Sequence, residues 1–250
     1  VLVTVKSPSL PEVAAGIAPL LGPATPAIFV MNGIPWWYFD GAGGALAGHR
    51  MESLDPGDAL RHAVGLRRTV GGVVYSACEV VEPGVIRSTH SRLRLFLGTP
   101  DGRGEPAAGR VAELLSASGF AARMVPEIRA EVWRKLLGNL SSGPLCLLTR
   151  RDLRTTLADP AIHATACRQR EEALAIAAGC GVVLADAEDS VALVRDLPHK
   201  PSVLQDVERG RPTEFATLFR APLALARLVG VATPTLDLTI ALAALASGEA

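Results

Sequence analysis

The chain has 250 residues, of which 49% are hydrophobic and 4% aromatic, and its 25 basic residues balance 25 acidic ones. This composition supports a sizeable core and argues against intrinsic disorder. The zero formal net charge gives no electrostatic case for a nucleic-acid partner. Few aromatic residues, together with many Ala, Leu, Val and Gly, favour α/β and helical architecture over a β-sandwich.

The first third of the chain alternates strand and helix signals. An apolar β-branched run at 1–5 ends at Lys6, helical spacing follows at 9–18, and a second apolar run at 27–31 ends at Asn32-Gly33. Continuous apolar runs separated by a helix predict parallel strands that are covered on both faces. The pattern is typical of half of a doubly wound nucleotide-binding sheet.

The rest of the chain changes from strands to helices. Residues 70–97 carry β-rich segments broken by glycines, which predicts an antiparallel extension of the sheet. A helix at 107–118 and a short strand ending at Met124 come next. Beyond Pro126 the pattern is helical, with helices expected at about 127–142, 159–179, 186–196, 213–229 and 234–246. We therefore expect two domains, residues 1–125 and residues 126–250.

Cysteine spacing and hydropathy bear on location and partners. The four cysteines are scattered without metal-ligand spacing, so we expect no metal site and reduced thiols in a cytoplasmic protein. The most apolar stretch, 221–246, is interrupted by prolines and charges, which predicts two packed helices and no membrane span. These apolar helices leave a homodimer open. Because the chain opens inside an apolar run without Met, we expect it to belong to a longer protein.

Lys135 and Asn139 stand four residues apart in a predicted helix, so they project from one face, roughly 6 Å apart. An ammonium and an amide placed in this way can hold a ketone oxygen and a neighbouring polar group. The spacing alone favours another interpretation, a surface lysine paired with Glu131, which is also four residues away.

Other polar residues stand at strand ends and helix starts. Lys6 and Asn32 each follow an apolar strand, at the carboxyl edge where doubly wound sheets bind ligands. An Asn-Gly pair is usually only a turn, so both interpretations stay open. Ser202 either caps the helix after it or binds a carboxylate with its hydroxyl. Glu214 stands in the first turn of the next helix, where the helix dipole favours an acid.

Order and spacing of these motifs agree over nearly the whole chain with one known pattern. Its elements are the strand ending in Lys6, Asn32-Gly33, Glu131 with Trp133-Arg134-Lys135-Leu136 and Asn139, Ser202-Val203-Leu204-Gln205-Asp206, Arg211-Pro212-Thr213-Glu214 and Pro234. In this pattern the chain resembles the ketopantoate reductase family. The resemblance implies an α/β Rossmann-like nucleotide-binding domain, incomplete at its N-terminus. An all-α domain like that of 6-phosphogluconate dehydrogenase would follow.

The resemblance also implies an activity, the NADPH-dependent reduction of 2-dehydropantoate to (R)-pantoate in pantothenate and coenzyme A biosynthesis. It makes Lys135 the catalytic proton donor, because an ammonium stabilises the negative charge that grows on the ketone oxygen. Lys135, Asn139 and Ser202 would bind the 2-keto acid substrate. The residues that match cofactor contacts are Lys6, Asn32 and Glu214. Orientation of Lys135 is a second role for Glu214.

Two departures from the family pattern keep alternatives open. The glycine-rich G-x-G-x-x-G turn, which holds pyrophosphate at a helix N-terminus, has no counterpart before Lys6. The asparagine commonly found four residues after Asn139 is Gly143 here, with Ser141 or Ser142 as substitutes. The alternatives are a reductase of a different 2-keto acid and a non-catalytic remnant that has lost its nucleotide site.

Overall fold

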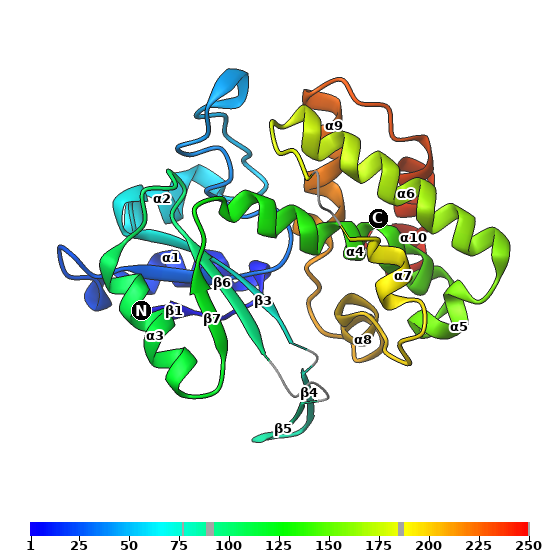
Figure 1. Cartoon of the computed structure of the whole chain (residues 1–250), viewed down its shortest axis with the longest axis horizontal. Helices are drawn as coiled ribbons and strands as arrows, with labels where there is room; N and C mark the ends of the chain where they lie inside the picture. The colour runs from blue at the N-terminus through cyan, green and yellow to red at the C-terminus, as the bar shows by residue number, and fades with distance from the viewer. Residues whose placement is uncertain (77, 89–92, 185–187, 250) are drawn as a thin grey trace. The chain divides into compact units, whose positions relative to one another are not determined.

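The computed structural model of the chain describes residues 1–76, 78–88, 93–184 and 188–249, and Figure 1 shows its elements. The chain divides into two compact units. Unit 1 comprises Val1–Val5, Ser9–Met31 and Pro35–Glu131, and unit 2 comprises Lys6–Pro8, Asn32–Ile34 and Val132–Ala250. The expected domains, 1–125 and 126–250, stay a prediction.

Unit 1 is built on a five-stranded sheet with the order β1-β2-β3-β6-β7. β1 (Leu2–Val3), β2 (Ala27–Val30) and β3 (Thr69–Tyr75) are parallel, β6 (Arg94–Gly98) is antiparallel to β3, and β7 (Ala121–Met124) is parallel to β6. The predicted parallel strands and their antiparallel extension are confirmed. β4 (Cys78–Glu82) and β5 (Val85–Ser88) were expected in this sheet but form a two-stranded sheet of their own.

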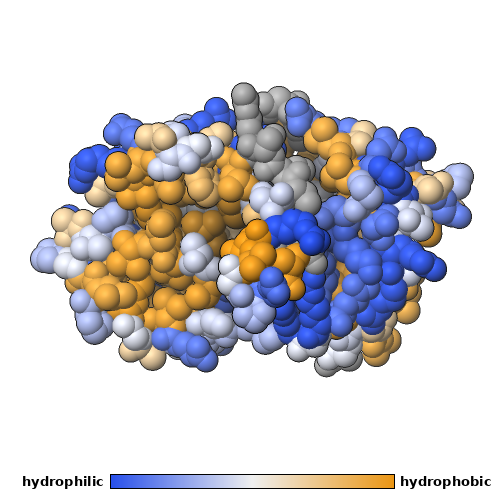
Figure 2. Space-filling model, turned by 90° about the horizontal axis from the view of Figure 1, so that it is seen from below, coloured by the Kyte–Doolittle hydropathy of each residue, from blue (hydrophilic) through white to orange (hydrophobic). Residues whose placement is uncertain are grey.

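Helices and short turns cover the sheet of unit 1. The helices are α1 (Leu10–Gly16), α2 (Ala59–Ala63) and α3 (Pro106–Ala117). Side chains alternate between the two faces of a strand, and one face packs against α3 in a buried cluster made of Ile28, Val70, Leu95, Leu97, Ala108 and Ala112. Figure 2 shows hydrophobic residues gathered on the surface of the sheet-bearing part of the chain. Exposed apolar side chains of this unit include Leu2 and Leu114.

The aromatic segment after Ile34 is part of the core of unit 1. Trp36, Trp37, Tyr38 and Phe39 form turns and not a strand, and each is at most 4% exposed. The ring of Trp37 lies directly over β3 at Gly71, where a Cβ would come within 2.1 Å of Trp37 Cζ2. Glycine is therefore required at this point of the strand, because any side chain would displace the indole.

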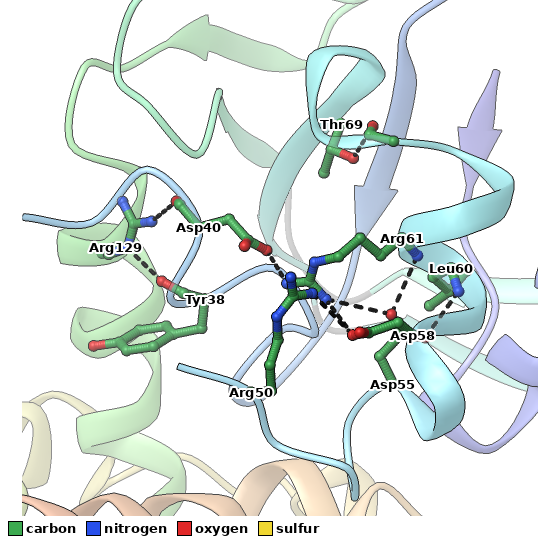
Figure 3. Close-up of polar contacts among 10 residues, drawn as sticks. Tyr38, Asp40, Arg50, Asp55, Asp58, Leu60, Arg61, Thr69 and Arg129 are labelled. Carbon is green, nitrogen blue, oxygen red and sulfur yellow. Dashed lines mark hydrogen bonds and ion pairs between the residues drawn. The ribbon is translucent and has the colours of Figure 1, made fainter. Parts of the chain in front are cut away.

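Two arginines tie this segment to its surroundings, as Figure 3 shows. Arg61 of α2 forms ion pairs with Asp40, Asp55 and Asp58. Burial raises the pKa of the Asp40 carboxyl, although Arg61 opposes the shift. Arg129 donates to main-chain carbonyls of Tyr38 at 2.7 Å and Pro100 at 2.8 Å, and also to that of Asp40. The guanidinium group of Arg129 thus gives three loop carbonyls a hydrogen-bond donor, whereas that of Arg61 pairs with carboxylates.

Unit 2 is helical, as the sequence predicts. Its elements are α4 (Ile128–Thr149, whose first turn lies in unit 1), α5 (Leu153–Leu157), α6 (Pro160–Gly179), α7 (Ser190–Val194), α8 (Ser202–Glu208), a π-helical turn (Ala216–Arg220), α9 (Ala221–Leu228) and α10 (Pro234–Ser247). α4 continues past its expected end at residue 142, with Pro144 inside it. Among the described residues, no helix combines the length and the apolar character that crossing a membrane requires.

We expect Gly71→Ala to destabilise unit 1 by about 1–3 kcal/mol, because the added methyl group overlaps a buried indole that has no room to move. Urea denaturation followed by circular dichroism measures the change as a lower midpoint. Gly43→Ala is the matched control, since a Cβ at residue 43 meets no atom within 4 Å. Equal midpoints for the two variants would contradict the prediction.

Candidate active site

A hydrogen-bonded chain in unit 2 links an ammonium group to a carboxylate through one amide. Lys135 Nζ, on α4, donates to Asn32 Oδ1 at 2.5 Å. Asn32 Nδ2 donates in turn to Glu214 Oε2 at 2.8 Å. The other carboxylate oxygen, Glu214 Oε1, accepts the main-chain N–H of Ser7 at 3.4 Å. Four segments that are far apart in the sequence are thus joined by these hydrogen bonds.

The chemistry of the three groups fixes the orientation of the amide. An ammonium only donates and a carboxylate only accepts, whereas an amide does both. The amide oxygen of Asn32 must therefore face Lys135, and its NH2 must face Glu214. An aspartate or a leucine at position 32 could not satisfy both neighbours.

Burial changes the proton affinity of both charged ends of this chain. The loss of hydration around Lys135 lowers its pKa to about 8, and the negative charge of Glu214 opposes part of that shift. Burial raises the pKa of Glu214, against the hydrogen bonds from Asn32 and Ser7 and the charges of Lys135 and Lys6. Because its pKa is about 8, Lys135 is mostly charged at neutral pH and releases its proton far more readily than an ordinary lysine.

Lys6 lies in the same unit but contacts a different helix. Its Nζ forms an ion pair of 2.5 Å with Asp206 Oδ1 of α8, where the Asp206 side chain is 9% exposed and that of Lys6 is 43% exposed. The ammonium of Lys6 is therefore anchored at α8 while part of its surface stays accessible. Sequence reasoning gave Asp206 no role, although an acid among the apolar residues of a short helix is a signal for a buried partner.

Asn139 and Ser202 are placed by their helices. Asn139 is half-buried, one turn after Lys135 on α4. Ser202 is exposed and is the first residue of α8, whose N-cap position is held by Pro201. Of the two interpretations of Ser202, capping of this helix is therefore not the one that the structure shows, and the residue is exposed. The hydroxyls of Ser141 and Ser142 donate to carbonyls of their own helix, so neither replaces the polar side chain that Gly143 lacks.

The interpretation of Lys135 as a surface lysine does not fit this geometry, since the side chain is half-buried and the carboxylate that acts on its pKa is Glu214. In the described part of the chain, no three His, Cys, Asp or Glu side chains are grouped so that they could hold a metal ion. The arrangement thus places the ammonium of Lys135, which has a lowered pKa, near the buried carboxylate of Glu214, with the amide of Asn32 bonded to both.

The lowered pKa of Lys135 can be measured directly, because the sequence contains three lysines, Lys6, Lys135 and Lys200. In an NMR titration of lysine labelled at Cε, we expect one signal to titrate near pH 8 and to vanish in Lys135→Met. In Glu214→Gln that signal should titrate at a lower pH, since the charge that favours the ammonium is gone. An unchanged titration in Glu214→Gln would show that Glu214 does not act on Lys135.

The chain is similar to known proteins over most of its length. Residues 127–246 match the family model described as ketopantoate reductase PanE/ApbA C terminal. The chain is 41% identical to a 2-dehydropantoate 2-reductase of Mesorhizobium japonicum over 244 residues, which are 97% of this chain and 74% of that protein.

Solved structures show the same fold. A protein of Ralstonia solanacearum assigned as a ketopantoate reductase superposes with a TM-score of 0.89 at 37% identity, over 99% of this chain and 76% of that one. A D-mandelate dehydrogenase solved with NADH and anilino(oxo)acetate has a TM-score of 0.79 at 22% identity, over 99% of this chain and 75% of that one. The identity to the Mesorhizobium enzyme and the matched C-terminal model together establish that the chain belongs to the ketopantoate reductase family of oxidoreductases.

Proposed function

We propose that the protein reduces 2-dehydropantoate to (R)-pantoate with NADPH, as part of pantothenate and coenzyme A biosynthesis. The observation that carries the proposal is the Lys135–Asn32–Glu214 chain, which holds an ammonium of lowered pKa beside a buried carboxylate. The family supports the same activity, since the Mesorhizobium relative is described as a 2-dehydropantoate 2-reductase.

In this proposal Lys135 is the acid. Its ammonium has three N–H donors, so one can stay on Asn32 while another points at the ketone oxygen of the substrate. As the carbonyl carbon is reduced, negative charge grows on that oxygen, and Lys135 Nζ stabilises the charge and transfers a proton to it. The product is the alcohol, and Lys135 is left neutral until it takes a proton from solvent. Glu214 favours that return through its charge.

The donor groups of this chain suit a nicotinamide cofactor, which supplies the hydride when it is bound. Lys6 and Asn32 lie within three residues of the ends of β1 and β2, and ligands of doubly wound sheets bind at the carboxyl ends of the strands. Lys6 keeps an accessible ammonium for an anionic or hydroxyl group, and Asn32 keeps a half-buried amide. Glu214 would act beside the cofactor at least through Asn32, whose amide it holds.

Asn139 and Ser202 are proposed to bind the substrate. Asn139 stands one helical turn from Lys135 on the same face of α4, so its amide can reach a polar group next to the ketone. The accessible hydroxyl of Ser202 at the start of α8 suits the carboxylate. Because α8 has only seven residues, the proposal assigns carboxylate binding to the Ser202 hydroxyl and not to the N-terminus of the helix.

Gly143 favours a second candidate, a reductase that acts on a different 2-keto acid. This residue continues the Lys135–Asn139 face of α4, and a Cβ at position 143 would come within 2.8 Å of Phe219 Cζ. An aromatic ring thus occupies the space into which a polar side chain at 143 would extend. Under this candidate the chemistry of Lys135 is the same, and only the side chain of the preferred substrate differs.

Assembly and location extend the proposal. α10 exposes Leu238, Leu242 and Leu245 along one face, which supports the expectation of a homodimer, because apolar stripes on helices commonly pack between subunits. Cys78, Cys146, Cys167 and Cys180 are free thiols, as suits the cytoplasm.

Lys135→Ala should reduce turnover of the purified gene product by roughly 10²–10⁴-fold, because a general acid contributes that much. We expect little loss of stability, because Glu214 keeps its hydrogen bonds from Asn32 and Ser7 and, with a pKa already raised by burial, can be neutralised by taking up a proton. Activity is followed as NADPH oxidation with 2-dehydropantoate, and stability as the thermal midpoint. Lys200→Ala is the control, because Lys200 pairs with Glu208 at the surface. Near-normal turnover in Lys135→Ala would exclude Lys135 as the acid.

A panel of 2-keto acids separates the two candidates. The first predicts that kcat/KM is highest for 2-dehydropantoate, and the second predicts a higher value for a keto acid without its hydroxyl group. Each substrate is assayed with NADPH and with NADH, which also tests the cofactor. If no keto acid on the panel is reduced by wild-type protein with either cofactor, the reductase proposal fails as a whole.

A further inference from the structure

The helix after Glu214 contains a main-chain carbonyl that the helix itself cannot use. Leu218 N–H donates to Glu214 O at 2.9 Å, as in an α-helix. At the π-helical turn the next donor changes, and Ala221 N–H binds Ala216 O, five residues back. For Thr217 O the helical donor would be residue 221 or residue 222. Residue 221 is already committed, and residue 222 is a proline without an N–H.

The carbonyl of Thr217 instead accepts a hydrogen bond from another segment. Ile34 N–H donates to Thr217 O at 3.0 Å. The two main chains approach so closely that a Cβ on Gly33 would lie 2.4 Å from Thr217 O and 2.7 Å from Thr217 Cβ. Gly33 also has a φ of +76°, in the left-handed region that favours glycine. Both the conformation and the space at this position therefore require glycine.

This contact decides where Asn32 lies. Asn32 immediately precedes the Gly33-Ile34 segment, and its amide must bridge Lys135 and Glu214 with the correct end toward each. Glu214 stands three residues before Thr217, just ahead of the helix that contains Thr217. Ser7 touches both residues, through its N–H to Glu214 Oε1 and its Oγ 3.4 Å from Thr217 Oγ1. A shift of residues 33–34 away from Thr217 would withdraw the amide from both partners.

We propose that Gly33 and Pro222 are positioning residues for the reaction: Pro222 leaves the Thr217 carbonyl free, and that carbonyl holds the Gly33-Ile34 segment so that Asn32 orients Lys135. A proline ring also clashes with the carbonyl four residues before it in an α-helix, and the extra residue of a π-turn relieves such a clash. The role of these residues in catalysis rests on the proposed function, whereas the hydrogen bond between Ile34 N–H and Thr217 O does not.

Gly33→Ala tests the device against Gly181→Ala. Both glycines have a left-handed φ, +76° and +81°, but a Cβ at residue 181 meets no atom within 4 Å. We expect Gly33→Ala to lower kcat at least tenfold, with a smaller change in KM, and Gly181→Ala to keep wild-type kinetics. Gly33→Asn separates conformation from space, because asparagine tolerates a left-handed φ but carries a Cβ. It should be as impaired as Gly33→Ala.

The pH profile distinguishes positioning from general damage. Asn32 Oδ1 accepts from the charged form of Lys135 and so favours it; losing that bond lowers the pKa of Lys135. Because the acid must be protonated, the fall of kcat at alkaline pH should begin at a lower pH in Gly33→Ala. Glu214, which faces Lys135, and Lys6, which faces Glu214, are unchanged in this variant. An alkaline limb that does not move while kcat falls would overturn the positioning role.

Pro222→Ala tests the same device without a steric clash, because the new N–H can bind Thr217 O within the helix. Hydrogen exchange of the peptide that contains Ile34 should then be faster than in wild type, and kcat should fall with the same shift of the alkaline limb. Pro160→Ala, in the first turn of α6, is the control and should change neither measurement. Unaltered exchange at Ile34 in Pro222→Ala would refute the proposal. If wild-type protein reduces no keto acid, the function fails, and exchange alone still decides whether the contact depends on Pro222.

Discussion

Burying an ammonium and a carboxylate a few ångströms apart is the constraint on which the helical unit depends. Either group alone would be costly in a poorly hydrated place, and leaving one unpaired costs about 3–5 kcal/mol. In this protein the amide of Asn32 joins the two groups, since it accepts from Lys135 and donates to Glu214. The amide gives each group a hydrogen-bond partner, while burial keeps the pKa of Lys135 low in spite of the charge of Glu214.

The backbone around Asn32 follows from that requirement. An amide that bonds to two fixed partners tolerates little displacement. The segment that contains Asn32 must therefore be held in place by contacts of its own. The docking uses a left-handed glycine, one main-chain hydrogen bond and a proline on the neighbouring helix. Directly after it, the aromatic residues Trp36 and Trp37 anchor the continuing chain in the core of unit 1. Asn32 is thus followed in the sequence by large apolar side chains that are buried in a core.

Much of the fold could be predicted from periodicity, because apolar runs and helical spacing are local signals. The strands β2 and β7 and the helices α3, α6 and α10 lie within a residue or two of their expected bounds. The aromatic run at 36–39 forms buried turns that no local signal predicts, since its packing against Gly71 is a long-range contact. The end of α4 was placed too early, because Pro144 reads as a stop signal although the helix absorbs it.

In the candidate site, too, motif residues could be predicted from the sequence and long-range contacts could not. Lys135, Asn32 and Glu214 could be named from motif order, and the structure joins them by hydrogen bonds. Their roles stay a proposal. Asp206 and Thr217 escaped prediction for a physical reason: Asp206 acts through an ion pair to a residue 200 positions away, and Thr217 acts through its carbonyl. Residue type carries no information about a main-chain oxygen, and spacing within one element says nothing about which distant segment will meet it.

The grouping of residues 6–8 and 32–34 with the helical unit has a consequence for how such a protein can be recombined. The C-terminal family model covers residues 127–246. A gene fragment that begins at residue 127 would therefore seem to encode a complete domain. It would nevertheless leave behind Ser7 and Asn32, and with them the partners of Glu214 and Lys135. A chimera that takes only the helical part from this protein would therefore contain Lys135 and Glu214 without the Asn32 that joins them. Residues 6–8 and 32–34 would have to be taken from the same protein.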